Sequence, residues 1–360
     1  MCTIAGYVGS RPAAPILIDM LRKEQFFDGG RSTGIATVHN GRLYTAKVTG
    51  DLDTLLRETD ALSLPGCVGI IHSRTNDNLV EHAHPFTSHD GRLALVLNGT
   101  SRGVNTPEFW AEMNRVMGSF FDRGLNIKSM YDNLTSENPK MVLPNGRNYA
   151  FTETYALFMG DRVKDSPKDT LARGLAHAAK DALDTLPADI VTLSVHADLP
   201  DTVTAGVVTR PMVVCVGDGE AYMATSALAL PEDMQTRPLI SLPPTSVSQI
   251  TPDGVKIVST SLKNARVEQI DHRIAAQSYL RTEQALLGQK DDPKSVYDMP
   301  DLSDLWSAPA SDCKFAAEEG FLKPSAALRY ETLWALHRQG RLRQTIGERN
   351  GFPITKFWVE

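Results

Sequence analysis

The sequence predicts an α+β fold, in which strands and one long helix occupy residues 2 to roughly 262 and helices dominate the remainder. Three observations predict it. Short runs of apolar and β-branched residues recur along the first part, as strands require. Two tight-turn signals, Asn40-Gly41 and Asp218-Gly219, each stand between such runs and favour antiparallel hairpins. Between these two regions, a segment from about residue 166 has the apolar period of an amphipathic helix.

The first elements follow one another closely from the start of the chain. Residues 2–9 are apolar and β-branched, which predicts a strand at the terminus itself. Pro12 then introduces a helix that carries Leu17 and Leu21 on one face, and Gly29-Gly30 ends it. Further strands of this part are expected at residues 33–39, 43–48, 67–73 and 93–97.

The middle of the chain is less regular. Residues 113–121 have a helical pattern, but residues 133–148 are polar and rich in turn formers, which indicates an inserted excursion. A helix is expected to start at Ser166-Pro167, with Asp169 in the capping-box position. Later strands are expected at residues 190–197, 203–208, 212–216 and 221–224.

Past residue 266 the pattern changes. Residues 267–287 and 326–337 have helical periodicity, a polar linker rich in Asp and Pro occupies 289–304, and an apolar run closes the chain at 352–359. We therefore expect two domains, residues 2–265 and residues 266–360, the second being a smaller and mostly helical extension.

Charge and composition exclude several classes of protein. Apolar residues at 42% and charged residues at 22% are ordinary for globular chains, which excludes collagen-like, coiled-coil and largely disordered proteins. The net charge of −6 gives no general attraction to polyanions. No apolar window is long enough to span a bilayer and no signal peptide is evident, so no membrane partner is expected. The four cysteines lack paired spacing, which indicates a cytoplasmic location.

The C-terminal tail has a local excess of positive charge. Residues 323–349 carry six basic and two acidic side chains. Two helices followed by an apolar run could form a winged-helix-like unit that binds nucleic acid. A face that is solvated or docks on a partner subunit is the more common outcome, so we do not expect nucleic acid as a partner. The histidines lack metal-ligand spacing, and we expect neither a metal nor a cofactor.

Cys2 is the most informative single residue. Removal of Met1, which is usual before a small residue, would leave Cys2 with a free α-amine. Because such an amine has a pKa near 8, it can accept the thiol proton, and one residue then supplies both nucleophile and base. The alternative is a buried cysteine in an N-terminal strand, so the choice depends on further motifs.

Further motifs follow Cys2 in order over about 225 residues. They are STGIA from Ser32, GIIHSR from Gly69, HAHP from His82, VLNG from Val96, TET from Thr152, PMVV from Pro211 and ATS from Ala224. This series resembles the class II glutamine amidotransferases, and in particular the glutaminase domain of glucosamine-6-phosphate synthases. The resemblance implies a four-layer αββα N-terminal-nucleophile hydrolase sandwich over residues 2–265.

The resemblance also implies roles for individual residues. Cys2 is then the catalytic nucleophile, and Asn98 with the backbone N–H of Gly99 forms the oxyanion hole that such chemistry needs. Arg74 binds the substrate carboxylate, for which a guanidinium is well suited. His84 matches the family's His-Pro segment, and we interpret it as structural support. Taken alone, Asn98-Gly99 would suggest only a hairpin turn and Arg74 only a surface ion pair.

Three departures from the family pattern affect substrate binding. Asp28 stands in the place of a family arginine, and Asp77 lies in a segment that replaces the family's Trp-Ala-Thr-His-Gly. Tyr155 stands where the family has the aspartate that pairs with the α-ammonium of glutamine. A tyrosine can accept a hydrogen bond there but carries no full negative charge. Asp77 or Glu153 could compensate, so we expect substrate binding to involve Arg74, Asp77 and Tyr155.

The sequence thus favours a glutaminase that hydrolyses glutamine through a Cys2 thioester. The chain lacks the patterns of an ammonia-consuming domain, so we expect an acceptor site on a separate synthase subunit, and a homodimer is possible. Two alternatives stay open. One is an amidohydrolase of another small amide that lacks the α-ammonium; the other is a catalytically inert amidotransferase-like module used for binding or regulation.

Overall fold

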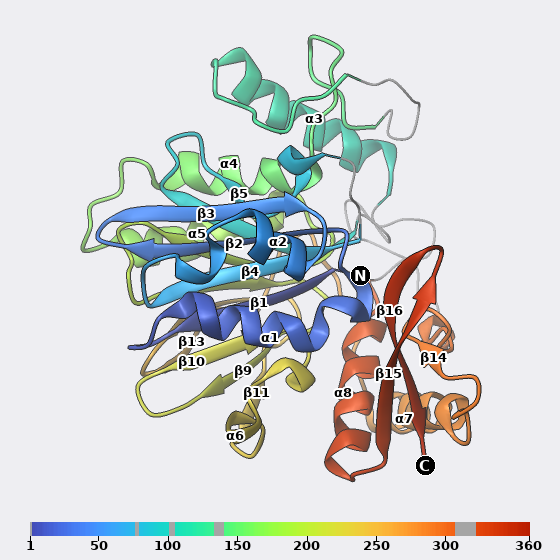
Figure 1. The fold of residues 1–360 in the computed structure, drawn as a ribbon. Helices are drawn as coiled ribbons and strands as arrows, with labels where there is room; N and C mark the ends of the chain where they lie inside the picture. Colours follow the sequence, from blue (N-terminus) through green and yellow to red (C-terminus); the bar gives the residue numbers. More distant parts are fainter. Residues whose placement is uncertain (1, 76–78, 101–104, 133–139, 307–321) are drawn as a thin grey trace.

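The computed structural model describes residues 2–75, 79–100, 105–132, 140–306 and 322–360, and all structural statements below concern these residues. Two antiparallel sheets form the centre of the molecule (Figure 1). The seven-stranded sheet has the order β11-β9-β10-β1-β4-β2-β3 and the six-stranded sheet the order β13-β12-β8-β7-β6-β5. The chain therefore has the mixed α+β fold with antiparallel sheets that the sequence predicts.

The strand bounds are as follows. The larger sheet contains β1 (Thr3–Val8), β2 (Ser32–His39), β3 (Arg42–Thr49), β4 (Val68–Arg74), β9 (Val213–Val216), β10 (Ala221–Ala224) and β11 (Leu239–Ser241). The smaller sheet contains β5 (Phe86–Thr87), β6 (Leu93–Thr100), β7 (Asp189–His196), β8 (Val203–Val207), β12 (Ser246–Thr251) and β13 (Gly254–Ser259).

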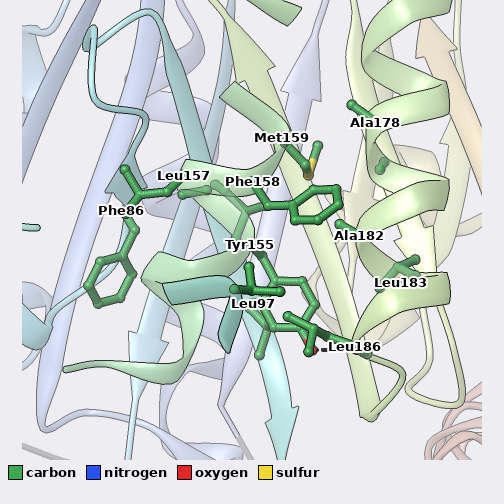
Figure 2. Close-up of a cluster of buried hydrophobic side chains, with 14 of the residues drawn as sticks. Phe86, Leu97, Tyr155, Leu157, Phe158, Met159, Ala178, Ala182, Leu183 and Leu186 are labelled. Carbon is green, nitrogen blue, oxygen red and sulfur yellow. Dashed lines mark hydrogen bonds between the residues drawn. The ribbon is translucent and has the colours of Figure 1, made fainter. Parts of the chain in front are cut away.

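The two sheets pack face to face, and helices cover their outer faces. Aliphatic side chains of β1 and β4 meet those of β6, β7 and β8 in one buried cluster between the sheets. Helices α1 (Ala13–Asp28) and α2 (Leu52–Glu58) pack on the outer face of the larger sheet. Helices α4 (Phe151–Val163) and α5 (Leu171–Thr185) pack on the outer face of the smaller one. Figure 2 shows part of the cluster beneath α4 and α5.

Two helices differ from the expectation. Helix α5 begins at Leu171 rather than at Pro167, because residues 167–170 form a turn before it. Helix α4 was not predicted as a helix, because it is buried nearly all round and has no apolar stripe. Short elements complete the chain before residue 271: α6 (Glu232–Gln235) and 3-10 turns at Ala61–Ser63, Val80–His82 and Ala227–Ala229.

The described residues between β6 and α4, 105–132 and 140–150, form an excursion that is wider than the segment 133–148 predicted from the sequence. Helix α3 (Pro107–Asp122) begins after Thr106, whose side chain accepts a hydrogen bond from the backbone N–H of Phe109. It is longer than the predicted helix over 113–121, and it carries its own buried aromatic side chains. In Figure 1 the excursion lies at one side of the two sheets.

The C-terminal segment is mixed rather than mostly helical. Helices α7 (His272–Leu286) and α8 (Ser325–Arg338) accompany a three-stranded sheet of β14 (Lys294–Ser295), β15 (Leu342–Arg349) and β16 (Phe352–Val359). The hairpin turns at Asn350-Gly351, where both residues have positive φ. The hairpin was not predicted from the sequence, because most of β15 is exposed and its sequence is strongly polar. A 3-10 turn at Ser303–Leu305 completes the segment.

The C-terminal segment packs against the end of α1. The Phe27 ring lies edge-on to Phe357, with ring centroids 5.3 Å apart. The Arg31 guanidinium lies 3.6 Å from the centroid of the Phe352 ring. Among the helices that the structure describes, none combines the length and the apolar character that a bilayer crossing needs.

Candidate active site

Strand pairing brings the N-terminal cysteine to the end of β4. Strands β1 and β4 run antiparallel, with Thr3 opposite Ser73. The next position along this register places Cys2 opposite Arg74, and Arg74 interacts electrostatically with Cys2. The Sγ atom of Cys2 lies 3.9 Å from Oγ1 of Thr75. The nucleophile and the cation predicted from separate motifs are therefore neighbours.

The alternation of side chains along strands adds the predicted oxyanion residue to this group. In β1, Ile4 points into the space between the sheets, so Cys2, two residues earlier, shares that direction. In β6, Ala94 and Val96 point into the same space, and Asn98 follows with the same period. Cys2 and Asn98 therefore project from opposite sheets toward one end of the inter-sheet space.

Asn98 and Gly99 have the properties of an oxyanion hole. The Asn98 side chain is fully buried, and neither its amide nitrogen nor its oxygen has a hydrogen-bond partner in the described part of the chain. Such an unmet buried donor is costly, which suggests a functional reason for it. Gly99 has a φ of 141°, and a Cβ there would lie 2.1 Å from the carbonyl oxygen of Asp189. Only glycine therefore fits at this point of β6.

A cavity of about 270 Å³ opens beside Cys2. Its described lining residues come from the strand ends, the excursion and the start of α4: Cys2, Arg74, His84, Leu97, Gly99, Thr100, Asn105, Trp110, Lys140, Met141, Phe151 and Thr152. Three of the predicted catalytic and binding residues thus line one cavity.

Arg74 is held at the cavity by its own backbone surroundings. Its Nη1 donates a hydrogen bond to the carbonyl oxygen of His82. Burial lowers the pKa of the Arg74 guanidinium from its usual value, although arginine stays protonated in proteins. The cavity therefore contains a fixed positive charge next to the thiol.

Two buried histidines, His72 and His84, lie beside the cavity and connect the elements that form it. The rings of His72 and His84 have centroids 3.7 Å apart. His84 Nε2 lies 3.0 Å from Oγ1 of Thr152, and His72 Nε2 lies 3.1 Å from the carbonyl oxygen of Leu97. Burial lowers the pKa of both imidazoles well below the usual value, so both rings are neutral. The pair connects β4 with β6 and α4.

Tyr155 does not line the cavity, which corrects the expectation that it contacts substrate. It is fully buried in α4, and its hydroxyl donates a hydrogen bond of 2.6 Å to the carbonyl oxygen of Leu186. Figure 2 shows it among Leu97, Leu183 and Leu186. The physical reason is the helical rise: Tyr155 lies one turn, about 6 Å, beyond the cavity-lining Phe151. Burial raises the pKa of its hydroxyl well above the usual value.

The Glu153 carboxylate also makes its hydrogen bonds away from the cavity. Its carboxylate accepts hydrogen bonds from the backbone N–H groups of Lys128 and Ser129, at 2.7 and 2.9 Å, and from the Ser129 hydroxyl. It therefore anchors the excursion to α4 and does not line the cavity.

The other two departures from the family pattern are Asp28 and Asp77. Asp28 is not part of the described cavity wall, and Asp77 lies outside the described residues. Asp28 ends α1 and is buried, with Arg31, Arg210 and Arg349 near enough to influence it. Burial nevertheless raises the pKa of its carboxyl to about 9. Met1 also lies outside the described residues.

The residues of the far wall of the cavity were not predicted from the sequence. Asn105, Trp110, Lys140 and Phe151 line it, and three of them belong to the excursion. The only signal in the sequence was the insertion itself, because long irregular loops in compact domains often carry function.

Known proteins resemble the chain in sequence over most of its length. No family model matches it. Several glutamine–fructose-6-phosphate aminotransferases are similar to it in sequence. The enzyme of Synechocystis sp. is 27% identical over 269 residues, which are 74% of this chain and 38% of the relative. That of Symbiobacterium thermophilum is 30% identical over 269 residues, 72% of this chain and 37% of the relative. The chain thus spans about two fifths of the length of these relatives.

Solved structures share the fold. The glutamine phosphoribosylpyrophosphate amidotransferase of B. subtilis matches with a TM-score of 0.54 and 18% identity, covering 96% of this chain and 66% of that one. A structure described as the allosteric regulatory enzyme of purine biosynthesis matches with a TM-score of 0.55 and 16% identity, covering 98% of this chain and 67% of that one. The sequence relatives confirm the predicted resemblance, and the structures show a common fold.

Proposed function

Because the chain is homologous to class II glutamine amidotransferases, we propose that it hydrolyses the side-chain amide of glutamine and supplies the ammonia to an acceptor. The observation that supports this proposal is the cavity lined by Cys2, Arg74 and Gly99, with the buried Asn98 next to Gly99 in β6. Each of these residues has a distinct role in amide hydrolysis through a thioester.

The reaction begins with proton transfer within Cys2. Once Met1 is removed, the α-amine accepts the thiol proton, and Sγ attacks the carbonyl carbon of the amide. The Asn98 side-chain amide and the Gly99 backbone N–H donate hydrogen bonds to the oxyanion that forms. The tetrahedral intermediate collapses, the α-ammonium returns its proton to the leaving nitrogen, and ammonia departs. Water then attacks the thioester, which releases glutamate and regenerates the thiol.

Arg74 has two effects on this chemistry. Its guanidinium can bind the substrate carboxylate through two parallel hydrogen bonds. Its charge also disfavours a second positive charge beside it, so it favours the neutral form of the α-amine that must accept the thiol proton.

The same proposal extends to the architecture. We assign residues 2–265 to a four-layer αββα N-terminal-nucleophile hydrolase domain, supported by two facing sheets with helices on both outer faces. We assign residues 266–360 to a separate extension that packs on α1. A cytoplasmic location, an acceptor site on a separate synthase subunit and a homodimeric state are further parts of this proposal.

A second candidate function is hydrolysis of a related amide without an α-ammonium. The observation in its favour is that Glu153 and Tyr155 both make structural contacts away from the cavity.

The test is the intact mass of the protein before and after incubation with a diazo-ketone analogue of glutamine. We expect loss of Met1 and one adduct on Cys2, and the same adduct in a Cys67→Ser control, because Cys67 is a free cysteine on another part of the fold. A trimmed protein without an adduct would favour the related amide. A retained Met1 would contradict both candidates and indicate an inert binding module.

A further inference from the structure

Two side-chain cations line the cavity. Arg74 lies at the end of β4 beside Cys2, and Lys140 belongs to the excursion. None of the described lining residues is a carboxylate. This arrangement suits a ligand whose non-reacting end is negatively charged, because each cation attracts it and no described group of the wall repels it.

Lys140 is held in place at the wall. Its ammonium nitrogen lies 2.8 Å from Oδ1 of Asn105, and the same oxygen accepts a hydrogen bond of 2.7 Å from the indole nitrogen of Trp110. The Lys140 ammonium also lies 5.9 Å from the centroid of the Trp110 ring. An ammonium has three donors and the hydrogen bond to Asn105 uses one, so donors remain for a ligand oxygen.

Apolar side chains also line the cavity beside the two cations. Trp110 and Phe151 have ring centroids 6.5 Å apart, and both line the cavity with Leu97. Such walls favour the methylene groups of a ligand. The volume of about 270 Å³ lies just below the range that accommodates drug-sized molecules, so the ligand is small.

The residues of α4 that could have paired with an α-ammonium do not face the cavity. Glu153 accepts hydrogen bonds from the backbone of the excursion, and the Tyr155 hydroxyl donates to Leu186. The described wall therefore selects for the acid end of the substrate and makes no ionic contact with an amine beside it.

From these contacts we propose that the site recognises ω-monoamides of short dicarboxylic acids, with the free carboxylate held between Arg74 and Lys140. This inference rests on the proposed function and deepens it: glutamine is one member of the substrate class, and its α-ammonium is dispensable. Lys140 is the residue that determines specificity for the anionic end.

The first experiment compares three amides by steady-state ammonia release. They are glutamine, its des-amino analogue glutaramate, and the uncharged diamide glutaramide. We expect kcat/KM for glutaramate to be at least one tenth of that for glutamine, and kcat/KM for glutaramide to be at least 100-fold below both. A value for glutaramate below one tenth of that for glutamine would overturn the inference.

The second experiment replaces Lys140 in the full chain. We expect Lys140→Gln to raise KM for glutamine and glutaramate about tenfold, a loss of about 1.4 kcal/mol, with little change in kcat. Turnover of glutaramide should not change, and Lys140→Arg should restore most of the affinity. The matched control is Lys164→Gln, which removes an exposed lysine that contacts Asp161 outside the cavity. An unchanged KM in Lys140→Gln would overturn the role of Lys140.

The outcomes separate the two levels of the argument. If Cys2 is alkylated and glutamine is hydrolysed while glutaramate is not, only the substrate class is wrong. If Cys2 is not alkylated and no amide is hydrolysed, the proposed function fails and this inference fails with it.

Discussion

The cavity beside Cys2 has two halves of different construction. The reaction half consists of Cys2 and Gly99, which line the cavity, and the buried Asn98 next to Gly99. All three belong to or adjoin paired strands of the two sheets. The recognition half consists of Asn105, Trp110, Lys140 and Phe151, which come from the excursion and the start of α4. Arg74, at the end of β4, borders both. Under the proposed function, the chemistry depends on strand register, whereas substrate choice depends on a loop insertion.

The reaction half has little freedom to move. Asn98 and Gly99 lie in a strand that pairs with β7 along its whole length, and Gly99 contacts the Asp189 backbone too closely for any side chain. In the recognition half, Lys140 and Asn105 are joined by one hydrogen bond across 35 residues of sequence. The first half is therefore preorganised by the sheets and the second by a few polar contacts.

The largest effect is expected from Cys2→Ala. Loss of the nucleophile should lower the rate of ammonia release by at least about 10³-fold, because no other described thiol lines the cavity. The melting temperature should stay close to that of the wild type, since Cys2 precedes the first strand. Retained turnover would show that the reaction half is misassigned.

Asn98→Ala should lower kcat by about 10² to 10³-fold, as expected for one oxyanion donor. Because the Asn98 amide has no partner in the described structure, the variant should lose no folding stability and could gain some. Kinetics and urea denaturation of the same sample check both statements. A marked loss of stability with intact kcat would mean that Asn98 is structural.

Glu153→Gln tests how the recognition half is anchored. The variant loses the charged acceptor of two backbone N–H groups, which should cost about 1.5–3 kcal/mol of folding free energy. The excursion then loosens, so KM should rise about tenfold while kcat changes less. If kcat falls and KM does not, Glu153 acts on the reaction half instead.

Tyr155→Phe should leave both kinetic constants unchanged, because the hydroxyl is directed to Leu186 and away from the cavity. The Leu186 carbonyl loses its donor, and the free energy of unfolding should fall by about 1–2 kcal/mol. Denaturant titration measures this loss. A tenfold rise in KM would contradict this and show that Tyr155 contributes to substrate binding.

Asp28→Asn addresses a residue that lies in neither half. Burial raises the pKa of Asp28 to about 9, whereas the unfolded chain releases this proton near pH 3.9. At pH values between about 3.9 and about 9, unfolding therefore releases a proton from Asp28. The free energy of unfolding of the wild type consequently falls as pH rises through this range. The asparagine variant does not titrate, so its stability relative to wild type should rise by at most about 1.4 kcal/mol from pH 6.5 to 7.5. Urea denaturation at both pH values checks this; a relative gain for the wild type would contradict it.

The sequence by itself determined the reaction half and most of the architecture. The N-terminal position of Cys2, the motif around Asn98-Gly99 and the hairpin signals are local, and the period of two along each strand determines which residues share a face. Pairing of β1 with β4 then places Cys2 next to Arg74. Local signals were enough to predict these features, because side chains alternate along a strand and their spacing in the sequence determines the face to which each points.

Only the tertiary structure decided the recognition half and the C-terminal hairpin. Whether Tyr155 faces substrate or core depends on how far α4 extends beyond the cavity, and the motif beside it carries no such information. Lys140 reaches the cavity because the excursion returns to Asn105 and Trp110. The Asn350-Gly351 turn is a local signal, but the polar strand β15 is defined by its pairing with β16, whose Phe357 packs against Phe27. These features rest on contacts between distant segments, and local periodicity does not encode them.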